Sequence, residues 1–486
     1  MSYRAILVRL SRNTLSMYAA FFVRKAAVLV LGVAIANWSG AGAFGLYCLA
    51  LTLVEFGLRL VVFGTDILVV REISAAAPEC EQTVRNTLAW RAIAAVAMYP
   101  LLVAGAGLLT SDTAFRVAIA LMGTALFTDT MGDLYLGVVQ GRERVDLCAL
   151  AEGLVSLVGL GFGLAALAAG WGLQGLAAAY ALRGVANLVL GMLVYRRIHV
   201  DGIIAWGWQP GAIIALLKKA APIGVNRLLT IIYLGSGMVM LQYFHSEESV
   251  GRYAGSMKIF DACTAMGMLT MVAAFPTIAR LRVSAPDDLR RTAADLLRFF
   301  GWLGIPLSIT VALASDLILR SVFGPDFAHY GLALVLLMAA VPFSLFYGLI
   351  ERLAYAAHDQ HRVLWVRFVS TAVNILVIML CIGRIEYLAP AVAILVAEIA
   401  MVAMFLRRLN VYIPGMPWRA EITPPLVAAA VALVPALAAR PLIRPFEGLL
   451  FLLVFAAIGV FHMVIHMRPD SAGGSRTIDS TRGDAP

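Results

Sequence analysis

Apolar stretches long enough to cross a membrane recur along the whole chain, and this feature limits the fold more than any other. Each stretch runs for about 18–25 residues, which as an α-helix spans a hydrocarbon core about 30 Å thick. The composition agrees, because 61% of the 486 residues are hydrophobic and 14% are charged, whereas a soluble domain has roughly 45–50% and about 25%. We therefore predict an all-α polytopic membrane protein with about fourteen transmembrane helices.

The formal net charge of +9 follows the predicted loops. Of the 38 Lys and Arg residues, 22 lie in segments predicted to face the cytoplasm, 5 lie in the opposite loops and 11 lie within spans. Cytoplasmic segments of membrane proteins carry such an excess. The charge therefore predicts an orientation, with both termini in the cytoplasm of a bacterial inner membrane. It does not indicate nucleic-acid binding.

Residue matches that share one offset indicate an internal repeat. At an offset of 206 the matches are Gly45-Leu46-Tyr47 with Gly251-Arg252-Tyr253, Glu55 with Asp261, Arg85 with Arg291, and Pro100 with Pro306. Arg144 meets Arg362 at an offset of 218. These matches favour two related six-helix lobes around a central cavity, as in transporters built from repeats, plus two C-terminal helices.

The predicted spans and loops divide the chain into five regions. They are an N-terminal six-helix lobe (1–200), an interfacial linker (201–221), a C-terminal six-helix lobe (222–410), an additional helix pair (411–467) and a disordered cytoplasmic tail (468–486). The linker contains Trp206, Trp208, Lys218 and Lys219, a composition typical of an amphipathic helix at the membrane surface. The tail is polar and contains Gly and Ser, which is typical of disorder.

Cationic side chains inside the predicted spans indicate a functional site. Each costs about 2.5–3.5 kcal/mol at lipid depth, so each needs a partner or a wet cavity. The candidates for a cationic, substrate-binding cavity are Arg24, Lys25, Arg59, Arg227 and Lys258. Arg24 and Lys25 are the strongest of these, because they lie inside an apolar run with no acidic neighbour in sequence.

Structural interpretations of the same cations stay open. Arg227, Arg91 and Arg116 lie near span ends, where a long side chain could reach the lipid head groups instead. Arg59 lies four residues after Glu55 on one helical face, so these two side chains could simply neutralise each other. Lys258 and Asp261, three residues apart, could do likewise.

Acidic residues in the spans are fewer. Asp129 and Asp133 share one helical face, which could face water and bind a coupling cation. An equally good interpretation is a hydrogen-bonded seam between two helices. Asp261 is the third candidate for an ion-coupling or cavity acid. We expect no cofactor and no metal, with coupling to protons or sodium as a possibility.

Signatures of enzymes are not found in the sequence. The chain has no phosphate-binding loop, no Cys-x-x-Cys pair, no His-Glu-x-x-His and no nucleophile elbow. The predicted outside loops are also too short to hold the acceptor of a glycan polymerase or ligase. We therefore expect a transporter and not an enzyme.

Several short motifs resemble those of bacterial oligosaccharide flippases, the polysaccharide transporter family. They are Phe44-Gly45-Leu46-Tyr47, Gly64-Thr65-Asp66, Val70-Arg71-Glu72-Ile73, Gln140-Gly141-Arg142-Glu143-Arg144, Ala221-Pro222-Ile223-Gly224 and Val250-Gly251-Arg252-Tyr253. This family belongs to the superfamily that also contains multidrug-and-toxin-extrusion exporters and lipid II flippases. In lipid II flippases the eighth helix carries a cation followed three residues later by a carboxylate. Lys258 and Asp261 match this spacing, with Lys for the usual Arg, and Arg24 is the nearest match to an essential cation of the first helix.

The resemblance implies a two-lobed bundle that works by alternating access. It implies a flippase that moves a polyprenyl-pyrophosphate-linked oligosaccharide across the inner membrane for O-antigen, capsule or exopolysaccharide synthesis. The implied partners are membrane lipids, this lipid-linked substrate, and a polysaccharide polymerase with its chain-length machinery. A cation-coupled multidrug exporter of the same superfamily is the main alternative, and a membrane glycan polymerase or ligase is a weaker one.

Overall fold

The computed structural model describes residues 3–75, 80–198, 207–438 and 447–466. Its regular structure in these ranges is entirely helical, as predicted. The helices are α1 (Tyr3–Val62), α2 (Thr65–Ser74), α3 (Cys80–Leu109), α4 (Thr113–Gly123), α5 (Ala125–Gly141), α6 (Val145–Ala168), α7 (Gly172–Arg196), α8 (Pro210–Phe244), α9 (Glu247–Ser284), α10 (Pro286–Leu313), α11 (Ser315–Phe323), η1 (Pro325–Phe327), α12 (Gly331–Ala356), α13 (Gln360–Ile385), η2 (Glu386–Leu388), α14 (Ala389–Leu406), α15 (Leu409–Tyr412), α16 (Trp418–Ala438) and α18 (Glu447–His466).

Eleven of the helical segments in the described ranges are long and apolar enough to cross a membrane. The chain is therefore a multi-pass membrane protein, while the predicted count of fourteen spans is not confirmed. Two of the eleven segments, Tyr18–Val62 and Gln360–Leu406, contain 45 and 47 residues. Each is interrupted, by Gly40 in α1 and by η2 between α13 and α14, so a count by continuous segments is lower than one by sequence.

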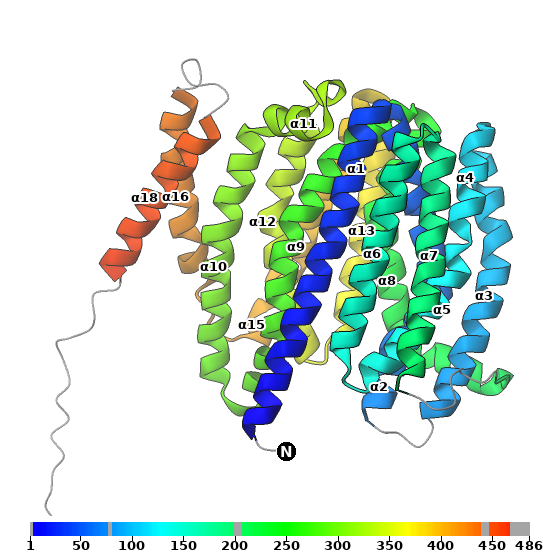
Figure 1. Ribbon diagram of the computed structural model, residues 1–486. Helices are drawn as coiled ribbons and strands as arrows, with labels where there is room; N and C mark the ends of the chain where they lie inside the picture. The colour runs from blue at the N-terminus through cyan, green and yellow to red at the C-terminus, as the bar shows by residue number, and fades with distance from the viewer. Residues whose placement is uncertain (1–2, 76–79, 199–206, 439–446, 467–486) are drawn as a thin grey trace, which may run out of the picture.

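The chain reverses direction inside α1 at Gly40. This residue has φ 79° and ψ 178°, a backbone conformation that a side chain with a Cβ would strain. We call the end of the bundle where α1 begins the near end, and the end where it turns the far end (Figure 1). Helix α1 ends at Val62, where the positive φ of Phe63 and Gly64 redirects the chain into α2.

The helices pack as two halves with a pair beside them (Figure 1). Helices α1–α7 contact one another, helices α8–α15 do likewise, and the halves meet mainly where α1 packs on α8 and α9. Helices α16 and α18 pack against each other and against α10. The guanidinium of Arg298 on α10 donates to both carboxylate oxygens of Glu421, at 2.7 and 3.1 Å.

The predicted region boundaries are not themselves tested by this arrangement, but one helix crosses one of them. Helix α8 runs without a break from Pro210 to Phe244, so the second part of the predicted linker is continuous with the following span. Its Leu216 and Ala220 are buried against Leu68 of α2, while Trp208 is exposed. The first part of the linker and the predicted tail, 468–486, lie outside the described residues.

Packing of the two halves at the far end is aromatic. Phe44 of α1 contacts Phe323 of α11 and Phe327 of η1, with ring centroids 5.6 and 5.9 Å apart. All three rings are fully buried. Asn37 adds a polar contact, because its Nδ2 donates to the Val322 carbonyl at 2.8 Å. This end of the bundle is therefore closed by direct contact between the halves.

Candidate functional site

A cavity of about 1030 Å³ lies between the two halves. Its walls come from α1, α2, α3, α5, α6 and α7 of the first half, and from α8 and α9 of the second. All eight residues selected from the sequence line it: Arg24, Lys25, Arg59, Arg227, Lys258, Asp129, Asp133 and Asp261. The structure thus brings them together around one space, and their roles in binding stay predictions.

Three of the five selected cations have an acidic partner across or along the cavity wall. Arg59 pairs with Glu55 at 3.0 Å, which is the intrahelical pairing that their spacing allowed. Arg227 of α8 pairs with Asp66 of α2 at 2.6 Å. Arg24 lies 3.9 Å from Glu152 of α6, a partner that cannot be seen in sequence because 128 positions separate the two.

The other two cations, Lys25 and Lys258, have no acidic partner within 4 Å among the described residues. The direct pairing with Asp261 that the spacing of Lys258 allowed is therefore not formed. Lys25 of α1 and Lys258 of α9 both act electrostatically on Asp261 from a longer range. The Nζ of Lys25 also lies 5.8 Å from the ring centroid of Phe21. Of the five selected cations, the two lysines are therefore the ones most available to an anion.

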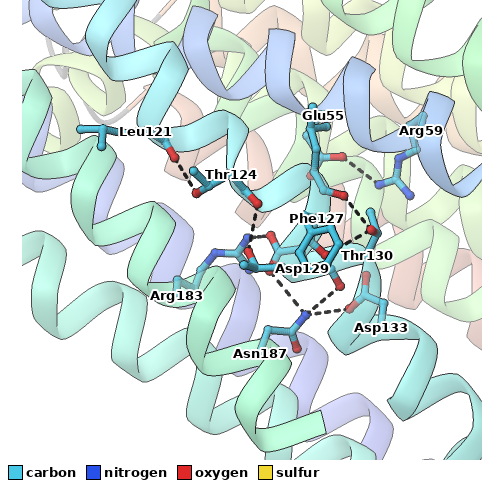
Figure 2. A network of polar contacts seen from close by, with 12 residues as sticks. Glu55, Arg59, Leu121, Thr124, Phe127, Asp129, Thr130, Asp133, Arg183 and Asn187 are labelled. Atoms are coloured by element: carbon cyan, nitrogen blue, oxygen red, sulfur yellow. Dashed lines mark hydrogen bonds and ion pairs between the residues drawn. The ribbon is translucent and has the colours of Figure 1, made fainter. Parts of the chain in front are cut away.

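The two selected aspartates of α5 belong to a polar network with α7 (Figure 2). Asp129 is 4% exposed and forms an ion pair with Arg183. Nδ2 of Asn187 donates to Oδ1 of Asp133 at 2.9 Å and lies 3.4 Å from Oδ1 of Asp129. The contacts of Asp129 therefore match the interpretation of a hydrogen-bonded seam between two helices. Asp133 takes part in the seam and is also exposed to the cavity.

Glycines let α5 and α7 approach closely enough to form this network. A Cβ on Gly132 would lie 2.7 Å from the Asn187 carbonyl oxygen, and one on Gly191 would lie 2.8 Å from the Gly132 carbonyl oxygen. On α6, a Cβ on Gly159 would lie 2.9 Å from Cδ of Arg183. Because these contacts are with backbone or with a held side chain, the network has little room to rearrange.

The two arginines expected near span ends differ in environment. Arg91 is fully buried, so it does not reach the head groups. Its Nη1 donates to the Thr130 carbonyl at 2.6 Å, and Nε and Nη2 lie 3.4 Å from Oγ1 of Thr65. Arg116 is exposed at the start of α4 and donates to the Ser111 carbonyl at 2.7 Å. The snorkelling interpretation therefore fits Arg116 and is wrong for Arg91.

Sequence reasoning missed several polar residues of the cavity. Asn187 is the main one, since an amide within an apolar span carries no charge signal, and Tyr180 and Arg71 are others. Arg183 also lines the cavity and lies outside the set selected from the sequence. The guanidinium carbon of Arg183 lies 4.5 Å from the ring centroid of Tyr180, which is a cation–π contact.

A second polar cluster lies in the other half, away from the cavity lining. Glu398 is buried and accepts a hydrogen bond from the Tyr233 hydroxyl at 3.1 Å. Arg367 donates to the Tyr347 hydroxyl at 3.1 Å and lies 3.7 Å from Glu351. The offset of 218 that relates Arg144 to Arg362 also relates Asp133 to Glu351, so the repeat could have indicated this cluster.

Comparison with known proteins agrees with this architecture. The chain is 22% identical over 464 residues to the probable flippase AglR of Haloferax volcanii, covering 93% of this chain and 94% of that one. The structure is similar to the lipid II flippase MurJ in an inward closed conformation, with a TM-score of 0.76 at 13% identity over 92% of this chain and 99% of MurJ. A multidrug resistance transporter of the MATE family in the MOP superfamily gives 0.67 at 14% identity over 80% and 94%.

The likeness to the solved structures shows the fold, a helical bundle in two halves shared by these transporters. The family is shown by the sequence itself. Residues 10–282, more than half of the chain, match the family described as polysaccharide biosynthesis protein. The chain therefore belongs to the polysaccharide biosynthesis protein family.

Proposed function

We propose that this chain is a flippase that moves a polyprenyl-pyrophosphate-linked oligosaccharide across the cytoplasmic membrane by alternating access. The carrying observation is the cavity of about 1030 Å³ between the two halves, into which Lys25 and Lys258 bring positive charge with no acid within 4 Å of either among the described residues. The product would serve surface polysaccharide synthesis, such as O-antigen, capsule or exopolysaccharide. Family membership supports the link to polysaccharide, and the names of AglR and MurJ support lipid-linked transport without chemistry on the substrate.

The chemistry of the substrate fits these two lysines. A pyrophosphate carries about two negative charges, which cannot cross hydrocarbon without compensation. An ammonium group is a compact point charge that suits phosphate oxygens, and Lys25 and Lys258 come from different halves of the bundle. An anion held between them would be in contact with both α1 and α9. Movement of one half against the other would then change the side from which this anion is reached.

Coupling to an ion would use Asp261. Asp129 is engaged by Arg183, whereas Asp261 lies under the influence of both lysines without forming a close ion pair with either among the described residues. An ionised Asp261 offsets one of the two positive charges, and a proton on it restores the full charge for the pyrophosphate. Asp261 is therefore the acid that we propose for proton coupling, with sodium as the alternative ion.

The orientation and partners follow from the same proposal. Both termini would lie in the cytoplasm, so the near end would receive substrate and the far end would release it. A polymerase with its chain-length machinery would then consume the released unit, because one lipid-linked repeat is not yet a polymer. This proposal includes no nucleic-acid partner.

The test is carried out in cells that make the surface polymer. Lys25→Gln with Lys258→Gln should cause the lipid-linked unit to accumulate and the surface polymer to disappear, while the variant is still inserted in the membrane. Arg116→Gln is a matched control, because Arg116 is exposed and lies outside the cavity lining. Unchanged lipid-linked pools and an intact surface in the double variant would contradict the proposal.

Drug export is the second candidate function. The number of acidic side chains in the cavity favours it, because acidic groups suit a cationic drug. Eight cationic and six acidic side chains line the cavity, so the acids offset most of its positive charge. The fold is also shared with a MATE transporter. Sensitivity of deletion cells to cationic compounds, with normal surface polysaccharide, would favour the exporter over the flippase.

A further inference from the structure

The cavity wall formed by α5 and α7 offers hydrogen-bond acceptors and no free cation. Asp133 is exposed to the cavity, and no cation lies within 4 Å of its carboxylate in the part of the chain that the structure describes. One of its oxygens accepts a hydrogen bond from Asn187, at 2.9 Å. The carboxylate thus retains acceptor capacity that faces the space in which a substrate would lie.

The arginines near this wall are already occupied. Arg183 is held by Asp129, and Arg59 is held by Glu55. Arg91 is fully buried behind the wall, where it donates to the Thr130 carbonyl. A negatively charged group placed against Asp133 would therefore meet a carboxylate that has no ion-pair partner within 4 Å among the described residues, while these three guanidiniums are engaged elsewhere.

The carboxylate is also held in one position. Asn187 is 5% exposed and bridges Asp133 and Asp129 through one amide nitrogen (Figure 2). The backbones of α5 and α7 are in direct contact at Gly132 and Gly191, so the two side chains cannot easily separate. Acceptors that are fixed before binding discriminate between ligands better than mobile ones, because no ordering cost has to be met.

Adjacent residues of α1 connect the part of the cavity that holds Lys258 with the wall that α5 and α7 form. Tyr47 is within electrostatic reach of Arg183, and Cys48 is within reach of Lys258. All four residues line the same cavity. One ligand could therefore have its anionic group at Lys25 and Lys258 and its adjoining sugar at Asp133.

We infer that Asp133, positioned by Asn187, is a specificity-determining residue that receives the hydroxyl groups of a neutral sugar next to the pyrophosphate and disfavours a sugar that carries a carboxylate. This inference rests on the proposed function and narrows its substrate class. Sugar hydroxyls donate hydrogen bonds to a carboxylate, whereas a uronate brings a like charge toward Asp133 in a space of reduced dielectric constant.

The experiment measures dissociation constants of the purified full-length protein in lipid nanodiscs. Three ligands with the same prenyl chain are compared: the unsubstituted polyprenyl pyrophosphate, its glucosyl derivative and its glucuronyl derivative. We expect the glucosyl compound to bind more tightly than the unsubstituted one, and the glucuronyl compound to bind about tenfold more weakly than the glucosyl one, which corresponds to about 1.4 kcal/mol.

Two variants of Asp133 separate charge from folding. Asp133→Asn should bring the glucosyl and glucuronyl compounds to within about threefold of each other, and Asp133→Glu should retain the discrimination. Asp295→Asn is the control, because Asp295 lies on α10 with its side chain 73% exposed and outside the cavity lining. It should leave all three constants unchanged.

Each outcome bears on a different proposal. Equal affinities of the wild-type protein for the glucosyl and glucuronyl compounds would overturn this inference and leave the flippase in place. The same would follow from an unchanged discrimination in Asp133→Asn. Absence of binding for all three ligands, the unsubstituted pyrophosphate included, would overturn the flippase proposal and this inference with it.

Discussion

Replacing Gly251 with alanine is expected to keep the far end of the bundle from closing. Gly251 of α9 packs directly on α1, where a Cβ would lie 1.9 Å from the Ala41 carbonyl oxygen. The reciprocal position is as tight, since a Cβ on Gly45 would lie 2.1 Å from the Glu247 carbonyl oxygen. These backbone contacts join the two halves beside the buried ring of Phe44.

The size of the effect follows from the distances. Because real Cβ atoms essentially never approach another atom closer than 3.0 Å, α1 and α9 would have to separate by about 1 Å at this point. The atoms that collide belong to the backbone, so no side chain can rotate away. Overpacking of this kind costs about 1–3 kcal/mol. An open far end would relieve it, so the closed population should fall by roughly 5- to 150-fold relative to the open one.

The assay uses a cysteine that already lines the cavity. Cys48 is 2% exposed, and the other four cysteines, Cys80, Cys148, Cys263 and Cys381, can be replaced by serine. A membrane-impermeant maleimide added at the far end should label Cys48 several-fold faster in Gly251→Ala than in the parent. Transport should fall at the same time, because a flippase that cannot close one end cannot alternate.

Gly153→Ala is the control for this experiment, since a Cβ at Gly153 of α6 meets no atom within 4 Å. It should leave both labelling and transport unchanged. The reasoning would be refuted by a Gly251→Ala protein that is labelled at the parental rate and transports normally. It would then follow that α1 and α9 can separate here without opening the cavity.

Three further predictions concern stability, measured by thermal or denaturant unfolding in detergent. Arg91→Met removes the buried guanidinium that donates to the Thr130 carbonyl and should lower the free energy of unfolding by about 1–3 kcal/mol; a loss below about 0.5 kcal/mol would contradict the assigned hydrogen bonds. Gly132→Ala places a Cβ 2.7 Å from the Asn187 carbonyl oxygen and should cost about 1–3 kcal/mol, whereas Gly105→Ala, which meets nothing within 4 Å, should cost nothing. Phe327→Ala empties the fully buried centre of the far-end aromatic cluster and should cost about 3–5 kcal/mol; a neutral result would show that this contact does not hold the two halves together.

The fold was largely accessible from the sequence because its main signal is local. Span length and hydropathy predict a helical membrane protein without any knowledge of packing. The reversal at Gly40 lies in the short loop, 37–44, that the sequence predicts between its first two spans, although the sequence does not show which residue has the positive φ. The linker was predicted as a separate amphipathic helix, whereas its second part is continuous with the next span in α8, where Leu216 and Ala220 pack on Leu68.

The sequence predicts which charged residues lie in the spans better than it predicts which of them form ion pairs. Charges at lipid depth stand out in sequence, so the eight selected residues were visible, and all line one cavity. Which acid meets which cation depends on helix neighbours far apart in the chain, as for Arg24 with Glu152 and Arg227 with Asp66. These pairs neutralise part of the positive charge, and of the five selected cations they leave Lys25 and Lys258 without a close acid among the described residues.

The most direct test of the central claim is transbilayer movement of the lipid-linked substrate in proteoliposomes. A radiolabelled polyprenyl-pyrophosphate disaccharide is placed in both leaflets, and the fraction open to an external, impermeant glycosidase is followed with time. The account predicts that the protein makes nearly the whole pool accessible, and that Lys25→Gln with Lys258→Gln reduces the rate at least tenfold while Arg116→Gln does not. A rate equal to that of protein-free vesicles, or one unaffected by the loss of both lysines, would contradict it.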